Sequence, residues 1–231
     1  MTNPYVSELV NRFSVHQNRE EADRMSQYMR RQFLYFGLRA PQMREITKLF
    51  LKDKGYPRLE NLSDCIFQLY ALPERELQIA ALYLMDYKIK EQPDITDIET
   101  IEYLITNKSW WDTVDHIAQN HAGVYFKKFP EMIRVYSEKW LQSDNIWLKR
   151  TAILFQLKYK EETDEELLFS ILSRSIGTKE FFINKAIGWA LREYSKVNKE
   201  AVIAFIYKYD EQLANLSKRE GLKWLKSREL I

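Results

Sequence analysis

The chain has 231 residues, 45% of them hydrophobic, and a formal net charge of +2, which suits one large globular domain or a continuous repeat array. Cys65 is the only cysteine, so no internal disulfide can form, and no run of about 18 apolar residues is present that would span a membrane. The first residues have neither the basic nor the apolar region of a signal peptide, so we expect a cytoplasmic protein.

Apolar residues recur at three- and four-residue spacing along almost the whole chain, which is typical of amphipathic helices. No segment alternates with period two for long enough to predict a strand, and the short connections favour antiparallel helix pairs. We therefore predict an all-α fold. Its helices should cover residues 4–15, 19–33, 41–53, 61–70, 73–90, 96–106, 110–122, 129–141, 145–159, 165–174, 179–196, 199–208 and 215–229.

A repeat underlies these helices. The segments LQIAALYLM, LKRTAILFQ and INKAIGWAL, which begin at Leu77, Leu148 and Ile183, resemble one another. Their shared register gives a series at intervals of 35, 36, 35 and 35 residues: Ala80, Asp115, Thr151, Ala186 and Gly221. Helix pairs with this period stack into an α-solenoid, in which each repeat contacts mainly its neighbours.

Polar residues accompany that register. Asp115 is the one carboxylate in the series, and the preceding position holds Arg150 and Lys185 in consecutive repeats. Two positions before the series, every residue is polar: Gln78, Thr113, Lys149, Asn184 and Arg219. We expect a polar stripe, which in a solenoid usually lines the concave binding surface.

Helical spacing also groups the side chains that could carry chemistry. The groups are Trp111 with Asp115, then Trp147, Arg150, Leu154 and Lys158, and then Lys185, Trp189 and Arg192. Each type has a structural alternative, because a Trp can fill the core, an Asp can brace a neighbouring helix and an Arg can pair with an acid. The occurrence of indoles, a carboxylate and cations in neighbouring repeats favours a functional site.

Other catalytic patterns are absent from the sequence. His116 and His121 are five residues apart, a spacing that does not place them on one face of an α-helix, and there is no HExxH or CxxC motif. No glycine-rich nucleotide-binding loop is present. We therefore expect neither a metal nor a cofactor.

Several segments resemble the AlkD family of bacterial DNA alkylation-repair glycosylases, in the same order and with similar spacing. In chain order they are YMRRQFLYFGL (28–38), KSWWDTVD (108–115), DNIWLKRTAILFQLKYK (144–160), KEFFINKAIGWALREYSK (179–196) and LSKREGLK (216–223). The resemblance implies an α-solenoid of HEAT-like antiparallel helix pairs, forming a single domain over residues 1–231. It also implies that this solenoid is curved, with a basic concave face that holds duplex DNA.

The resemblance also implies roles for individual residues. The family's catalytic aspartate corresponds to Asp115, and its lesion-facing tryptophans correspond to Trp111 and Trp189. Its functional arginine near the DNA backbone corresponds to Arg150, and a tyrosine of its N-terminal helices corresponds to Tyr28. By their position we add four further cations as phosphate ligands: Lys149, Lys158, Lys185 and Arg192.

The implied activity is that of a monofunctional glycosylase, which excises positively charged N3- and N7-alkylated purines from duplex DNA by hydrolysis of the N-glycosidic bond. We expect a monomer without a membrane partner, which is associated with the nucleoid when bound to DNA. The alternative is a non-catalytic HEAT-like scaffold that binds branched DNA, RNA or a protein. Asp115 distinguishes the two, since it would lie between the indoles in an enzyme and in a buried ion pair in a scaffold.

Overall fold

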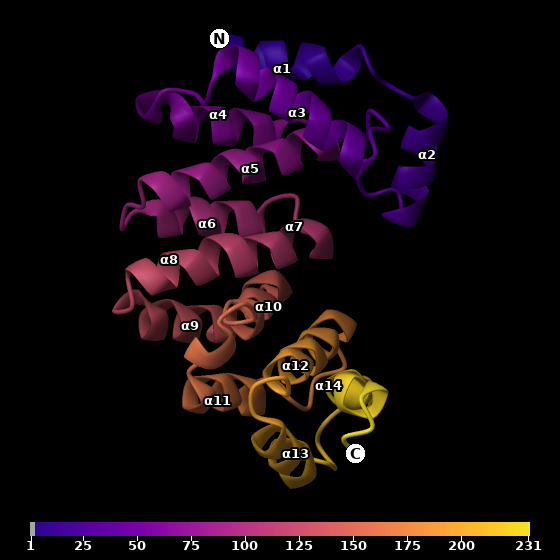
Figure 1. Cartoon of the computed structure of the whole chain (residues 1–231), viewed down its shortest axis with the longest axis vertical. Helices are drawn as coiled ribbons and strands as arrows, with labels where there is room; N and C mark the ends of the chain where they lie inside the picture. The colour runs from indigo at the N-terminus through magenta and orange to yellow at the C-terminus, as the bar shows by residue number, and fades with distance from the viewer. Residues whose placement is uncertain (1–2) are drawn as a thin grey trace. The chain divides into compact units, whose positions relative to one another are not determined.

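The computed structural model describes residues 3–231, which form helices joined by short connections (Figure 1). No β-strand occurs among these residues, apart from an isolated bridge between Leu34 and Glu74. The all-α prediction is therefore confirmed. Within the same range, no helix is long and apolar enough to cross a membrane.

The chain divides into two compact units, residues 1–92 and 93–231. The helices of the first unit are α1 (Pro4–Ser14), α2 (Arg19–Tyr28), α3 (Ala40–Lys54), α4 (Leu59–Ala71) and α5 (Arg75–Glu91). Within this unit α4 packs along α5, and α1 packs against α3 and α4 (Figure 1). Leu9, Phe50, Leu69 and Met85 are among its buried core residues. The prediction of a single domain over residues 1–231 stays a prediction.

The second unit holds the remaining helices. They are α6 (Asp97–Thr106), α7 (Trp111–His116), the π-helix η1 (Ile117–Ala122), α8 (Gly123–Lys128), α9 (Met132–Gln142), α10 (Ile146–Leu154), the 3-10 helix η2 (Lys160–Glu162), α11 (Glu165–Ser175), α12 (Phe181–Tyr194), α13 (Lys199–Lys208) and α14 (Asn215–Ser227). In this unit α10 packs against α7 and α12, and α12 packs along α14 (Figure 1). Phe126, Trp140, Phe155 and Ile187 lie in its core.

Side-chain caps fix where several helices begin. The Asn145 carboxamide oxygen accepts hydrogen bonds from the backbone N–H groups of Trp147 and Leu148, which have no partner inside the helix. Asp164 and Asn198 cap α11 and α13 in the same way. The start of α10, which carries Arg150, is therefore set by the local sequence.

The second helix is shorter than the periodicity predicts. It ends at Tyr28 rather than at residue 33, because Arg30 and Arg31 both adopt a positive φ of 57°. Beyond them, the backbone N–H groups of Gly37 and Leu38 donate to the buried carboxylate of Glu76, at 2.9 and 3.0 Å. This tertiary contact holds the segment away from the helical path that its sequence would allow.

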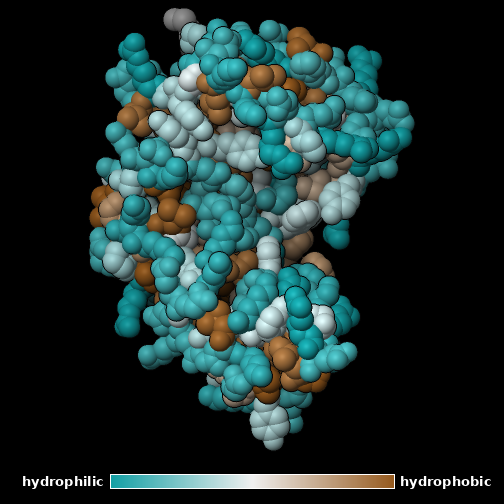
Figure 2. Space-filling model, in the orientation of Figure 1, coloured by the Kyte–Doolittle hydropathy of each residue, from teal (hydrophilic) through white to brown (hydrophobic). Residues whose placement is uncertain are grey.

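One face of the molecule is mostly hydrophilic, with hydrophobic side chains in small scattered groups (Figure 2). Exposed hydrophobic residues of this isolated kind are normal on a soluble surface and indicate no particular partner.

Candidate functional site

An ion pair between α7 and α10 forms the centre of the candidate site. The Arg150 guanidinium donates from Nε to Oδ1 of Asp115 at 2.7 Å and from Nη2 to Oδ2 at 2.8 Å. Its Nη1 donates to the backbone carbonyl of Phe182 at the start of α12. The Arg150 side chain is 3% exposed and that of Asp115 is 14% exposed. The pair therefore links three helices and leaves the acid as its more accessible member.

Burial and the guanidinium act on Asp115 in opposite directions. Burial raises the pKa of the Asp115 carboxyl above its ordinary value because the charged form loses hydration. The hydrogen bonds and the positive charge of Arg150 lower the pKa, while the negative charge of Asp112 raises it. Arg150 thus offsets part of the effect of burial, and the pKa of Asp115 stays above its ordinary value.

Three aromatic rings gather beside the pair. The Trp110 centroid lies 5.7 Å from that of Trp147 and 5.3 Å from that of Phe182, and the last two are 4.9 Å apart. Trp110 and Phe182 were missed in the sequence, although Trp147 and Phe182 are 35 residues apart and so follow the repeat. The three rings come from the starts of α7, α10 and α12, and the backbone carbonyl of Phe182 is the one that accepts from Arg150.

The two predicted lesion-facing indoles both belong to the second unit. Trp111 is the first residue of α7 and Trp189 lies in the middle of α12, and each side chain is partly buried. Tyr28, by contrast, belongs to the first unit, where it is the last residue of α2 and is 75% exposed.

Glu220 on α14, which sequence reasoning did not select, joins two of the predicted phosphate ligands. Lys185 Nζ donates to Oε1 of Glu220 at 2.8 Å and Arg192 Nη1 donates to Oε2 at 3.0 Å. Elsewhere, Lys158 Nζ donates to Oδ1 of Asn120 at 2.6 Å, and Lys149 is partly buried on α10. The predicted cations thus fall into separate positions, and two of them share one acid.

Three positions of the expected polar stripe are buried in the structure. They are Gln78, Thr113 and Asn184. Their side chains donate hydrogen bonds to backbone carbonyls of the turn that precedes their own helix. Asn184, for example, donates to the carbonyl of Thr178 at 2.9 Å. The prediction that this register lines a binding surface is wrong for these residues. Their polar side chains instead pair with backbone carbonyls at the start of their helices.

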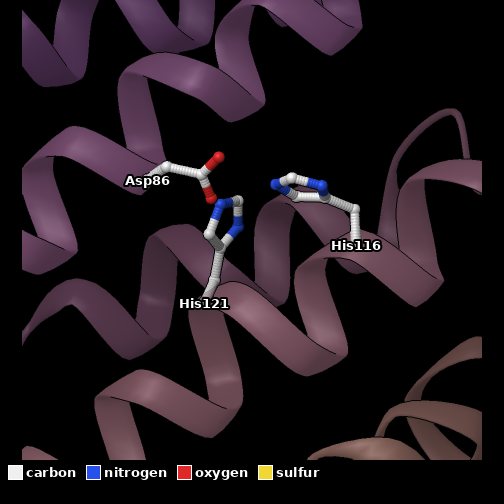
Figure 3. A group of neighbouring side chains, drawn as sticks. All are labelled: Asp86, His116 and His121. Carbon is white, nitrogen blue, oxygen red and sulfur yellow. The ribbon is translucent and has the colours of Figure 1, made fainter. Parts of the chain in front are cut away.

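His116 and His121 lie together, contrary to the prediction from their spacing. Residues Ile117–Ala122 form a π-helix, in which the hydrogen bonds run from i to i+5, so residues five apart meet on one face. The ring centroids are 5.2 Å apart (Figure 3). Asp86, which the figure also labels, belongs to α5 of the first unit. That the chain works without a metal stays a prediction.

These features describe an all-α chain that carries a carboxylate, indoles and cations on α7, α10 and α12. The sequence matches the DNA alkylation repair enzyme family over residues 9–225, and the chain belongs to this family, as the AlkD resemblance indicates. No curated protein gives a significant sequence match.

Two solved structures are similar to the chain. One is described as a predicted DNA alkylation repair enzyme from Enterococcus faecalis. It is 32% identical with a TM-score of 0.82, and the match covers 90% of this chain and 96% of that chain. The other is smu.31 from Streptococcus mutans UA159, at 18% identity and a TM-score of 0.59, covering 78% of this chain and 90% of that chain. The second likeness shows the fold alone.

Proposed function

We propose that the chain is a monofunctional DNA glycosylase that releases positively charged N3- and N7-alkylated purines from duplex DNA. The observation that carries the proposal is the Asp115 carboxylate, oriented by two hydrogen bonds from Arg150 and more exposed than its partner. Membership of a DNA alkylation repair family supports alkylated DNA as the substrate.

The chemistry needs a fixed negative charge and no general acid. An N3- or N7-alkylated purine is cationic, so when its glycosidic C–N bond breaks, the bonding electrons go to the base and it leaves neutral. Positive charge develops on the deoxyribose, where Asp115 stabilises it electrostatically. A water molecule oriented by Asp115 then bonds to the anomeric carbon and gives up its proton to solvent through the carboxylate. No lysine acts as a nucleophile, so no lyase step follows.

The remaining residues bind the nucleotide. Trp111 and Trp189 offer indole faces to the cationic nucleotide, each contact contributing about 0.5–2 kcal/mol. We assign to Arg150 the orientation of Asp115, because all three of its contacts are inside the protein. The phosphate contacts fall to the more exposed cations: Lys149, Lys158, Lys185 and Arg192. Tyr28 contributes a DNA contact from the first unit, a role that its exposure supports.

We also propose that the helices form a HEAT-like solenoid with a basic concave face that holds the duplex. Several hydrogen bonds within the second unit support this repeat, since they join residues 33 to 38 apart, whereas others span 28 to 32 residues. Examples are Ser217 with Asn184 at 33, Lys127 with Glu162 at 35, and Lys158 with Asn120 at 38. A constant separation is expected when equivalent positions of successive repeats meet.

A second candidate function is a non-catalytic scaffold that binds nucleic acid or protein. The Asp115–Arg150 pair favours it, because a buried ion pair at Asp115 is the arrangement expected of a scaffold from the sequence, and such a pair can simply brace α7 against α10. In that case the carboxylate would matter for stability and for nothing else.

Asp115→Asn separates the two functions. Duplex DNA containing N7-methylguanine is incubated with the protein, and released base is measured by chromatography. We expect release by the wild type and a loss of about 10²–10³-fold in Asp115→Asn, with folding retained. Asp112→Asn, which removes a neighbouring acid on the same helix, should stay near wild type. No release by the folded wild type, with this lesion or with a bulky cationic adduct, would leave only the scaffold.

A further inference from the structure

Glu220 is a buried acid that holds two cations of a neighbouring helix. It accepts hydrogen bonds from Lys185 and Arg192, which stand four residues before and three residues after Trp189 on α12. Residues at these spacings share one face of a helix, so the two cations flank the indole. The side chain of Glu220 is 10% exposed, against 39% for Lys185.

The packing of α14 on α12 positions Glu220 beside Lys185 and Arg192. Gly188 has no side chain, and a Cβ there would lie 2.6 Å from the Cβ of Glu220 and 2.9 Å from the carbonyl oxygen of Ser217. The Ser217 hydroxyl donates to the carbonyl of Asn184 at 2.8 Å across the same contact. The close approach at a glycine therefore fixes Glu220 against the α12 cations.

The charges of this cluster do not cancel. Glu220 meets two cations and so offsets only part of their charge. Arg192 Nε also lies 3.8 Å from Oε1 of Glu193, and Lys223 adds positive charge near Glu220. The pKa of Glu220 is lowered, chiefly by the hydrogen bond from Lys185, so the acid stays ionised and the restraint on the cations persists at neutral pH. In the absence of this acid, the positive charge that the cluster offers a phosphate would rise by one.

We propose that Glu220 is a specificity-determining positioning residue that holds Lys185 and Arg192 beside Trp189 and limits their attraction for undamaged DNA. The inference rests on the proposed function, because it treats the two cations as phosphate ligands. Phosphate contacts carry no information about a lesion, so excess positive charge tightens binding to every duplex alike. An acid that offsets one cation lowers this general affinity and leaves the lesion contacts to decide binding.

The test compares Glu220→Gln with the wild type in salt titrations of binding to unmodified duplex DNA. We expect Glu220→Gln to bind about 3–10-fold more tightly at low salt, with a log–log salt slope steeper by about one. Its preference for a duplex with N7-methylguanine over an unmodified one should fall. The control is Glu138→Gln, which raises the net charge equally by breaking the Arg174 pair on α9 and α11. This control should bind like the wild type.

An unchanged slope and affinity in Glu220→Gln would overturn the proposal, as would an equal gain in Glu138→Gln. If repulsion between the two cations unfolds Glu220→Gln, Lys185→Gln is compared with the double variant that adds Glu220→Gln. The double variant should then bind more tightly than Lys185→Gln, and equal binding would contradict the inference. Failure of the proposed function is distinct, since it appears as a wild type that binds DNA without releasing base or does not bind it.

Discussion

Two acid–base pairs join successive helices of the second unit, and in each pair the two residues are 35 apart in the sequence. Asp115 with Arg150 joins α7 to α10, and Lys185 with Glu220 joins α12 to α14. Their burial is reversed. The cation is the more buried member of the first pair, at 3% exposed against 14%, and the acid is the more buried member of the second, at 10% against 39%.

The two pairs therefore differ in which charge is the less buried. In the first pair it is the carboxylate of Asp115, at 14% exposed, a negative charge that suits the stabilisation of a developing cation. Burial of Glu220 leaves Lys185 and Arg192 accessible, which suits the binding of phosphate. A cationic nucleotide inside a polyanionic duplex requires both. A pair of residues on successive helices can thus leave either the acid or the base less buried, according to which partner the neighbouring helices cover.

The largest effect is expected where the first pair is broken. Arg150→Gln leaves the Asp115 carboxylate buried without its counterion, which should cost about 3–5 kcal/mol of the free energy of unfolding. Chemical denaturation measures this loss. The control is Arg174→Gln, which removes a similar fork-shaped pair with Glu138 on an exposed surface. Water screens that pair, so a much smaller loss is expected.

The loss in Arg150→Gln should also depend on pH. Without the guanidinium, the pKa of Asp115 rises further above its value in the unfolded chain. A carboxyl with a raised folded-state pKa favours folding in acid, and this contribution is lost as pH rises through the folded pKa. The deficit of the variant should therefore be full at neutral pH and shrink in acid. A deficit that is constant with pH would assign the loss to packing.

A smaller loss of stability is expected when the close packing of α12 on α14, which holds the second pair, is disturbed. Gly188→Ala places a Cβ at 2.6 Å from that of Glu220, so α14 must move away from α12. We expect a loss of about 1–3 kcal/mol in the free energy of unfolding. Gly221→Ala on the same contact meets side-chain atoms at 3.1 Å and beyond, and should lose less. Equal losses in both variants would contradict a specific role for the approach at Gly188.

The sequence predicted the helices well, because the spacing of apolar residues directly reflects which helical face is buried. It also placed Asp115 and Arg150 on adjacent repeats, and these two side chains meet in the structure. It did not predict that Arg150 would be buried on Asp115, because a side chain's partner depends on how neighbouring helices are rotated. Glu220 was missed for the same reason, although its distance of 35 residues from Lys185 was available as a signal.

Local backbone geometry explains the other errors. The α-helical rule separates His116 from His121, but the π-helix after Asp115 brings their rings together. The polarity of Asn184 suggests a binding surface, whereas its side chain completes the turn before α12. Neither a π-helix nor a side-chain brace has a distinctive residue pattern, so both are visible only in the folded chain.

The smallest effect is expected in the pH dependence of base release, because it changes the rate only in acid. Burial raises the pKa of Asp115 above its ordinary value, and only the ionised carboxylate can stabilise the developing cation. Release should therefore fall as the pH drops through this raised pKa. Arg150→Lys keeps the positive charge but loses the paired hydrogen bonds of the guanidinium to Asp115. Arg150→Gln loses both the charge and the paired hydrogen bonds. The acid limb of the pH–rate profile, in which release falls as the pH drops, should accordingly move to higher pH in Arg150→Lys and further in Arg150→Gln.

Release from the N7-methylguanine duplex is measured across the acid range for the three proteins, and spontaneous loss from the same duplex is subtracted. An ordered shift of the limb would show that the group being titrated is the one that Arg150 touches. If the limb stays in place in all three proteins, it belongs to a different group. Asp115 would then act in a range where its protonation never changes, and the pair would serve to join α7 and α10. In that case the Asp115–Arg150 pair would contribute to stability alone, and only the cluster of Glu220, Lys185 and Arg192 on α12 and α14 would contact DNA.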